Sequence, residues 1–294
     1  MNHYLSIQNS IDYIELNLTS QLTIESIAEK AYYSAFHFQR IFQAILGYSV
    51  KEYIRLRRLT KSLEDLSRHD ESVLEISLKY NYSSQEAFTR AFKKTFLVTP
   101  AAFRKNSKMQ GGVKDKMVRP VKLNPSELDL DQFLSIKKPR IVELDEMYII
   151  GRSYKTHLEG EKYFRDIPQF YDDFGHNAYY LDIPNRSCPD FAYGINCDYQ
   201  SSGAFNFLVG ETVTHLNTLP SPKLVTYTIP PGRYAEFELD GCIENAQNTW
   251  KYIYSVWLMT SKYTRRDGPD FEVIDVCRSK YPDNIKMNIY IPVK

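Results

Sequence analysis

One nine-residue pattern occurs twice in the first hundred residues, and this duplication restricts the possible folds more than any other feature. Residues 34–42 read Ser-Ala-Phe-His-Phe-Gln-Arg-Ile-Phe, and residues 84–92 read Ser-Gln-Glu-Ala-Phe-Thr-Arg-Ala-Phe. Each copy begins with a serine, a residue that caps helices, and places two phenylalanines four positions apart, on one helix face. The pattern predicts one helical unit present in two copies.

Further helix signals surround both copies. A short helix is expected before each of them, one capped by Thr23 and one by Ser72, which opens an S-x-x-E capping box. Gly47 ends the first repeated helix, a helix over 49–67 joins the copies, and Pro100 opens a last short helix. The connecting helix is about 27 Å long, so it can hold two recognition helices about one DNA turn apart. We therefore predict an all-α N-terminal domain with two helix-turn-helix units.

The two repeated helices carry residue types that recognise DNA bases in other proteins. Their paired phenylalanines belong in the core, which leaves the other residues for an outer face. Arginine recognises guanine and glutamine recognises adenine in the major groove. We expect DNA contacts from Ser34, Phe36, Gln39, Arg40 and Gln43, and from Gln85, Glu86, Thr89, Arg90 and Lys93. Phosphate contacts are expected from Lys51, Arg55, Arg57, Arg58, Lys93, Lys94 and Arg104. Each of these residues taken alone would be read as part of a solvated helix face; the duplication favours DNA.

The net charge of +1 hides opposite charges in the two halves. Residues 1–122 contain 19 basic and 12 acidic side chains, whereas residues 123–294 contain 18 and 24. The basic half suits double-stranded DNA, and the acidic half suits a different partner. Residues 108–138 lack periodicity and contain glycine and proline, as a linker does. We expect a DNA-binding domain over 1–107 and a second domain over 139–294.

The second domain has the sequence patterns of an α+β fold. Strands are expected near 141–150, 223–229, 234–237 and 287–293, and helices near 160–174 and 243–259. Strand, helix and further strands follow one another twice, so we expect a duplication within this domain. This domain holds 25 aromatic residues in 156 positions. Most of them belong to the core, but such an excess in an acidic domain also suits a cavity for flat or cationic organic molecules.

The first domain resembles the AraC/XylS family of transcription factors over residues 5–106. The matching positions are Ser34-x3-Phe38-x-Arg40-x-Phe42, Gly47-Tyr-Ser49-x3-Tyr53, Phe88-x-Arg90-x-Phe92-Lys93 and Thr99-Pro100-x2-Phe103-Arg104. The resemblance implies two helix-turn-helix units that enter successive segments of the major groove. Asn81 departs from the family, which usually has glycine in the second turn, although asparagine also tolerates the left-handed conformation. Glu86 is also less usual and would read a cytosine or adjust affinity.

The second domain resembles the GyrI-like effector-binding domain. The matching stretches are Ile229-Pro-Pro-Gly232-x-Tyr234-Ala-x-Phe237, Trp257-Leu258-x2-Ser261-x-Tyr263 and Gly268-Pro-Asp270-Phe271-Glu272-Val273. The resemblance implies two pseudo-symmetric β-α-β-β repeats with a ligand cleft between them, and an acidic residue in the floor of that cleft at Glu272. We expect ligand contacts from Glu272, Trp257, Tyr234, Tyr263 and Phe271. A buried carboxylate can compensate a cationic ligand; the alternative for Glu272 is a surface position on a strand.

Three functions follow from these patterns. The leading hypothesis is a non-enzymatic, ligand-responsive transcriptional regulator, an activator that binds DNA and RNA polymerase. In the second, the C-terminal domain is a hydrolase that uses Glu272 with Tyr234 or Tyr263, because some GyrI-like domains look hydrolytic. No G-x-S-x-G motif, P-loop or histidine-rich site supports that hypothesis. In the third, the C-terminal domain binds another protein and no small molecule.

The remaining sequence features predict a cytoplasmic protein. The first residues lack the basic region and apolar run of an export signal, and no apolar stretch of about 18 residues occurs, so no membrane partner is expected. The cysteines are widely spaced and lack neighbouring histidines: Cys188, Cys197, Cys242 and Cys277. We expect reduced structural thiols, no metal site and no cofactor.

Overall fold

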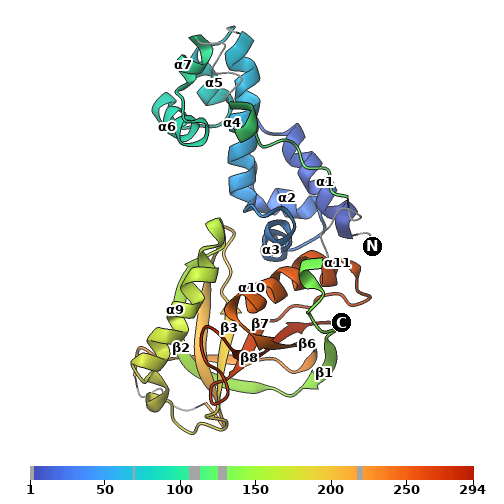
Figure 1. Cartoon of the computed structure of the whole chain (residues 1–294), viewed down its shortest axis with the longest axis vertical. Helices are drawn as coiled ribbons and strands as arrows, with labels where there is room; N and C mark the ends of the chain where they lie inside the picture. The colour runs from blue at the N-terminus through green and yellow to red at the C-terminus, as the bar shows by residue number, and fades with distance from the viewer. Residues whose placement is uncertain (1–2, 69, 106–112, 125–130, 217–220) are drawn as a thin grey trace. The chain divides into compact units, whose positions relative to one another are not determined.

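The computed structural model describes residues 3–68, 70–105, 113–124, 131–216 and 221–294. The chain divides into two compact units, Met1–Ser126 and Glu127–Lys294 (Figure 1). We refer to them as the helical unit and the sheet unit. Within the described residues, every helix is too short or too polar to cross a bilayer.

The helical unit has the element order that the repeat predicts. Its α-helices are α1 (His3–Leu16), α2 (Ile24–Lys30), α3 (Ala35–Leu46), α4 (Val50–Arg68), α5 (Val73–Lys79), α6 (Gln85–Phe96) and α7 (Pro100–Lys105). The pairs α2/α3 and α5/α6 form the two helix-turn-helix units, and α4 connects them. The predicted all-α architecture is confirmed.

Local capping explains where the repeated helices begin and end. Ser34 and Ser84 each accept a hydrogen bond from the backbone N–H three residues later. The helix α3 ends at Gly47, whose φ of 73° is the left-handed conformation expected for that glycine. The corresponding residue of α6 is Leu97, with φ of 64°. Because a Cβ disfavours this conformation, the second copy carries backbone strain where the first carries none.

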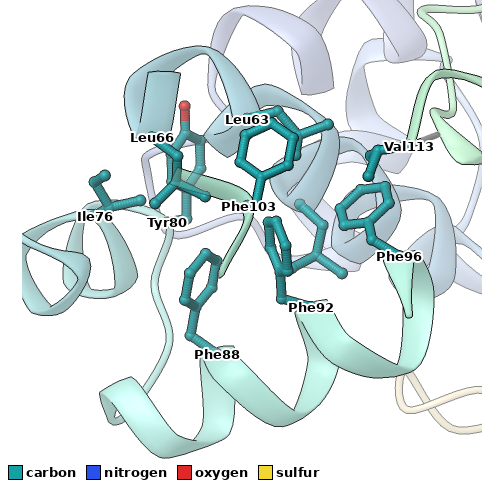
Figure 2. Packing of buried hydrophobic residues seen from close by; sticks show 10 residues of the cluster. Leu63, Leu66, Ile76, Tyr80, Phe88, Phe92, Phe96, Phe103 and Val113 are labelled. Carbon is teal, nitrogen blue, oxygen red and sulfur yellow. The ribbon is translucent and has the colours of Figure 1, made fainter. Parts of the chain in front are cut away.

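The core of the second helix-turn-helix unit fixes the orientation of α6 (Figure 2). Phe88, Phe92 and Phe96 are at most 2% exposed, and the centroids of successive rings lie 5.6 and 4.8 Å apart. They pack against residues from α4, α5, α7 and the segment after α7: Leu59, Leu63, Leu66, Ile76, Tyr80, Phe103 and Val113. Burial of one such side chain contributes about 1.5–3 kcal/mol. This apolar stripe decides which face of α6 points outward.

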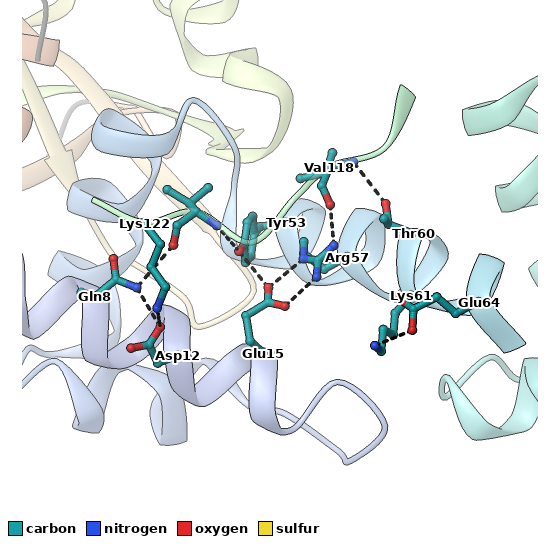
Figure 3. A network of polar contacts seen from close by, with 11 residues as sticks. Gln8, Asp12, Glu15, Tyr53, Arg57, Thr60, Lys61, Glu64, Val118 and Lys122 are labelled. Atoms are coloured by element: carbon teal, nitrogen blue, oxygen red, sulfur yellow. Dashed lines mark hydrogen bonds and ion pairs between the residues drawn. The ribbon is translucent and has the colours of Figure 1, made fainter. Parts of the chain in front are cut away.

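Residues 113–124, which we call the strap, belong to the segment predicted as a linker but pack on the helical unit. Val113 joins the core around α6. The Val118 carbonyl accepts a hydrogen bond from Arg57, and its N–H donates to Thr60 at 3.2 Å (Figure 3). Further along, the Leu123 N–H donates to the Gln8 side chain of α1 at 2.7 Å. The strap thus contacts the second helix-turn-helix core, α4 and α1.

The sheet unit repeats one arrangement of strands and helices. Its strands are β1 (Arg140–Leu144), β2 (Met147–His157), β3 (Phe191–Cys197), β4 (Ala204–Val213), β5 (Val225–Ile229), β6 (Gly232–Gly241), β7 (Asp270–Asp275) and β8 (Ile285–Pro292). The helix α9 (Lys162–His176) lies between β2 and β3 in sequence. The helix α10 (Ile243–Tyr252), followed by a π-helical turn and α11 (Leu258–Thr260), lies between β6 and β7. The predicted α+β class and duplication are confirmed, and each half holds one strand more than the expected β-α-β-β.

All eight strands form one antiparallel sheet in the order β1-β6-β8-β7-β3-β4-β2-β5. The central neighbours β3 and β7 come from different halves, and their register pairs Gly194 with Glu272 and Ile195 with Phe271. Successive side chains alternate between faces, so Glu272 and Phe271 point in opposite directions. The helix α9 packs on β2 and β4, and α10 packs on β6. Both helices lie on one side of the sheet, which we call the helix face (Figure 1). Glu272 points to this side, since it accepts hydrogen bonds from a residue of each helix.

Candidate functional sites

The helix α3 gathers four of the predicted DNA-binding side chains. At 100° per residue, one face points away from the core phenylalanines and carries Phe36, Gln39, Arg40 and Gln43. The Arg40 guanidinium lies 5.9 Å from the centroid of the Phe36 ring. Ser34 lies at the helix N-terminus, where its hydroxyl accepts from the backbone N–H of His37. Of the side chains on this face, Gln39, Arg40 and Gln43 are buried, at 7, 8 and 4% exposed, so their contact with DNA stays a prediction.

The outer face of α6 is built from three of its five predicted residues. Glu86, Arg90 and Lys93 are exposed on the side opposite the phenylalanine stripe, and Thr89 is half-buried at its edge. Gln85, the first residue of α6, is also exposed, although it precedes Phe88 by three residues and so lies in line with the phenylalanine stripe.

Glu86 has the charge state that recognition of cytosine needs. A hydrogen bond from the Ser84 side chain lowers the pKa of Glu86. The carboxylate is therefore ionised at neutral pH and can act as an acceptor. The cytosine amino group is the donor that such an acceptor reads in the major groove.

Three arginines that were expected to contact DNA phosphates instead form hydrogen bonds within the helical unit. Arg57 is 6% exposed at its side chain and donates to both carboxylate oxygens of Glu15, at 2.8 and 2.7 Å (Figure 3). Arg58 and Arg104 donate to backbone carbonyls in the loops before α2 and before α5. Basic composition alone cannot separate these internal donors from surface cations. Lys51, Lys93 and Lys94 are exposed, as a phosphate contact requires.

Asn81 adopts the left-handed conformation predicted for it, with φ of 60°. Its side-chain amide donates to the Thr19 carbonyl at 2.8 Å. Arg58 binds the same loop, at the carbonyls of Leu18 and Ser20. The turn of the second helix-turn-helix unit is therefore fastened to the loop after α1, a contact that glycine at this position could not make.

In the sheet unit, Glu272 joins the two helices of the helix face. It is 4% exposed. Its Oε1 accepts a hydrogen bond from the Tyr171 hydroxyl at 3.0 Å, and its Oε2 accepts one from Trp250 Nε1 at 3.1 Å. Tyr171 belongs to α9 and Trp250 to α10. Burial, together with the nearby Glu272 carboxylate, raises the pKa of Tyr171 well above its ordinary value, so its phenol remains a hydrogen-bond donor.

The glycine beside Glu272 makes this arrangement possible. A Cβ on Gly194 would lie 2.1 Å from the Tyr171 hydroxyl and 2.5 Å from Cζ of Phe207. Both distances are far below van der Waals contact, so a side chain here would displace the tyrosine or the phenylalanine. Tyr171 meets Phe207 edge to face, with 5.7 Å between ring centroids. Aromatic rings therefore border the carboxylate on the α9 side.

A second buried carboxylate on the helix face is held differently. Asp270 has no exposed surface and accepts hydrogen bonds from Arg265 Nε and Nη2, at 2.9 and 2.7 Å. The Tyr254 hydroxyl also donates to Asp270. Arg265 further donates to the carbonyls of Arg266 and Gly268. Asp270 thus has a fixed cationic partner and serves to anchor the loop before β7.

The other predicted ligand contacts are spread over the unit. Tyr234 and Phe271 meet on the face opposite Glu272, with ring centroids 5.5 Å apart. Trp257 lies on the helix face against Phe237, at 5.1 Å between centroids, and stacks on Tyr263 at 6.2 Å. The structure therefore places Tyr234 and Phe271 away from the Glu272 carboxylate.

The residues that do contact Glu272, Tyr171 and Trp250, escaped the sequence analysis. Because successive side chains of a strand point to opposite faces of the sheet, the sequence alone indicates that Phe271 and Glu272 lie on different faces. Trp250 precedes Trp257 by seven residues, about two helical turns, and the same reasoning would have put it on a shared face. Nothing in the sequence relates Tyr171 to Glu272, because their contact depends on how α9 crosses the sheet.

Comparisons with known proteins match both units. Residues 140–293 match the family model described as integron-associated effector binding protein, and residues 27–106 match a helix-turn-helix domain model. The transcriptional regulator Rob of Salmonella typhimurium is 29% identical over 304 residues, which cover 98% of this chain and 98% of Rob. The right origin-binding protein of Escherichia coli K12 is 29% identical over 303 residues, with 98% of each chain covered. The multiple antibiotic resistance protein MarA of the same organism is 37% identical over 107 residues, 36% of this chain and 84% of MarA.

Proposed function

Because the chain belongs to the integron-associated effector-binding protein family and carries an AraC-type helix-turn-helix domain, we propose that it is a ligand-responsive transcriptional regulator. In this proposal the helical unit binds double-stranded DNA in the cytoplasm, and the sheet unit binds a small hydrophobic or cationic molecule. Its likeness over nearly the full length to the regulator Rob supports placing both activities on one chain.

The observation that carries the ligand proposal is the Glu272 carboxylate between two helices. A carboxylate removed from water is stabilised only if hydrogen bonds or an opposite charge replace its hydration. Tyr171 and Trp250 supply hydrogen bonds without carrying a positive charge. A cation that enters beside them gains a strong electrostatic attraction, because the surroundings have a low dielectric constant, and gains cation–π contacts from the rings. We therefore propose an aromatic organic cation as the effector class.

Titration of the full chain with tetraphenylphosphonium tests this proposal. Both tryptophans lie in the sheet unit, and Trp250 contacts Glu272 directly, so binding is expected to change tryptophan fluorescence. Glu272→Gln removes the charge and should weaken binding at least about tenfold. The control Glu236→Gln alters a buried carboxylate on the opposite face, paired with Arg140, and should leave the affinity unchanged. A wild-type chain that does not bind this cation would contradict the proposal and favour a protein-interaction module.

The DNA proposal rests on the exposed face of α6 and on the face of α3 that turns away from its core phenylalanines. Sequences selected from random DNA should contain two short elements about 34 Å, one helical turn, apart. Arg90→Ala should raise the dissociation constant about tenfold and relax the base preference at one position. Arg40→Ala should do the same in the other element. Arg165→Ala, the same change on α9, is the control. Binding that is insensitive to salt would contradict phosphate recognition.

We further propose that the chain is an activator that acts through RNA polymerase. Its similarity to the transcriptional regulator Rob supports this step. A template that carries the selected DNA element should give more transcript with purified polymerase when the chain is added, and tetraphenylphosphonium should alter the yield. Reduced transcript on the same template would instead identify a repressor.

The arrangement of the predicted tyrosines gives the hydrolase alternative little support. Tyr234 lies on the face opposite Glu272, and Tyr263 stacks on Trp257. Tyr171 does reach Glu272, but its raised pKa makes it a poor general base. We therefore propose binding without turnover. Hydrolysis of an activated ester by the full chain, lost in Glu272→Gln, would overturn this view.

A further inference from the structure

The two helices that meet over Glu272 are bridged a second time, near one end of each helix. Lys251, in the last turn of α10, places its Nζ 3.4 Å from the Glu161 carboxylate, at the start of α9. The same Nζ lies 5.5 Å from the centroid of the Phe164 ring. A cation is thus held between a carboxylate and an aromatic ring.

This bridge lies next to the proposed ligand site. Lys251 directly follows Trp250, which donates to Glu272. Phe164 precedes Tyr171 by seven residues, about two turns of α9, so both rings lie on one face of that helix. The bridge therefore joins the two helices that hold Glu272. On α9 it shares a face with Tyr171, and on α10 Lys251 is the residue next to Trp250.

The partners of Lys251 have the chemistry that an organic cation would seek. An aromatic ring and a carboxylate are also what the site around Glu272 offers. The bridge is partly open to water, since the side chains of Lys251 and Glu161 are 38% and 39% exposed. Exposed ion pairs and cation–π contacts are individually weak, so a ligand can displace this one.

We infer that Lys251 is a resident cation at the rim of the effector site, displaced when a hydrophobic organic cation binds. The inference rests on the proposed function of the Glu272 site. In the free chain Lys251 links α9 to α10. When a ligand cation enters, it replaces the lysine ammonium beside the Phe164 ring and near the Glu161 carboxylate, and the lysine side chain moves into water. Lys251 thereby sets both the affinity of the site and its preference for charge.

The first test compares affinities in the full chain. Lys251→Met removes the charge, keeps most of the length, and should tighten tetraphenylphosphonium binding about three- to tenfold. Lys251→Arg should restore the wild-type affinity. Tetraphenylborate, which has a similar shape and the opposite charge, should not bind more tightly to Lys251→Met. The control is Lys262→Met, which removes a lysine that lies 5.2 Å from the Tyr263 ring in the same unit.

The second test follows the lysine itself. The rate at which an acylating reagent modifies Lys251, measured by mass spectrometry of the wild-type chain, should rise when tetraphenylphosphonium saturates the site. The rate at Lys262 should stay constant. An unchanged or slower rate at Lys251 would overturn the displacement, even if Lys251→Met binds more tightly through its altered charge alone.

The outcomes separate this inference from the function on which it rests. If the wild type binds the cation and Glu272→Gln weakens binding, while Lys251→Met and the labelling rate show no effect, only the role of Lys251 is refuted. If the wild type does not bind the cation, both proposals are refuted.

Discussion

Glu15 in the helical unit and Glu272 in the sheet unit are both largely shielded from water, but they accept hydrogen bonds from different kinds of donor. Glu15 accepts hydrogen bonds from the Arg57 guanidinium at both oxygens and from the Tyr53 hydroxyl at 2.8 Å. Glu272 accepts them from a phenol and an indole. A guanidinium brings a positive charge to its partner, whereas a phenol and an indole lessen the desolvation penalty by hydrogen bonds alone. The two carboxylates thus differ in the kind of hydrogen-bond donor that holds them, and the proposal of a cationic ligand concerns only Glu272.

Arg57→Met should have the largest effect on stability. It leaves Glu15 without its guanidinium and the Val118 carbonyl without its donor, and loss of one partner of a largely buried pair costs about 3 kcal/mol. The loss should appear in denaturant unfolding followed by circular dichroism, which reports the helices. Tryptophan fluorescence, which reports only the sheet unit, should keep its transition midpoint.

The matched control is Arg55→Met, also on α4, where the arginine is 38% exposed at its side chain and lies 3.8 Å from Glu52. This change should shift stability by less than about 0.5 kcal/mol. Equal losses in the two variants would refute the distinction between Glu15 and an ordinary surface carboxylate. Conversely, Glu272→Gln should leave the stability of the sheet unit unchanged or raise it slightly, because the buried charge disappears.

Gly194→Ala should have the next largest effect, confined to the sheet unit. Its Cβ would overlap the Tyr171 hydroxyl and the Phe207 ring, and such overpacking costs about 2 kcal/mol. Denaturant unfolding followed by tryptophan fluorescence measures this loss. Because the shortest contact is to the hydroxyl, combining the change with Tyr171→Phe should cost less than the sum of the two single variants. Strictly additive losses would mean that Gly194 does not position Tyr171 at Glu272.

The helical unit was predictable because its determinants are local. The serine caps, the Phe88 and Phe92 spacing and the left-handed residues at Gly47 and Asn81 each act within a few positions of the chain. The strap was not predictable, because its contacts to α1 and α4 join backbone groups to side chains more than 50 residues away. Arg57 illustrates the same limit, since its charge gives no indication that its partner is Glu15.

The Glu272 site was predictable only in part. The resemblance to a known domain singled out Glu272, and the strand pattern gave the α+β class. The contacts with Tyr171 and Trp250 depend on two helices from different halves that converge over β3 and β7, a tertiary arrangement that no local pattern contains. Strand alternation could have excluded Phe271, which shows that part of the error lay in the inference and not in the sequence.

Asp12 provides a third, exposed carboxylate and should show the smallest effect, with a defined pH dependence. It lies 2.9 Å from Lys122 of the strap, and the two side chains are 46% and 76% exposed. The hydrogen bond from Lys122 lowers the pKa of Asp12 in the folded chain. A carboxylate whose folded pKa is lowered stabilises the fold above its unfolded pKa of about 3.9 and loses this contribution as the pH falls through the lower, folded value.

Asp12→Asn should therefore reduce stability by at most about 0.5 kcal/mol at pH 7, and the difference from the wild type should vanish near pH 3. Unfolding curves followed by circular dichroism at both pH values, with exposed Asp70→Asn as the control, measure this difference. Salt weakens an exposed ion pair far more than a buried one. A loss of stability that persists undiminished at pH 3 or in 1 M salt would therefore contradict the prediction and place Asp12 with Glu15, whose bound partner holds the fold together.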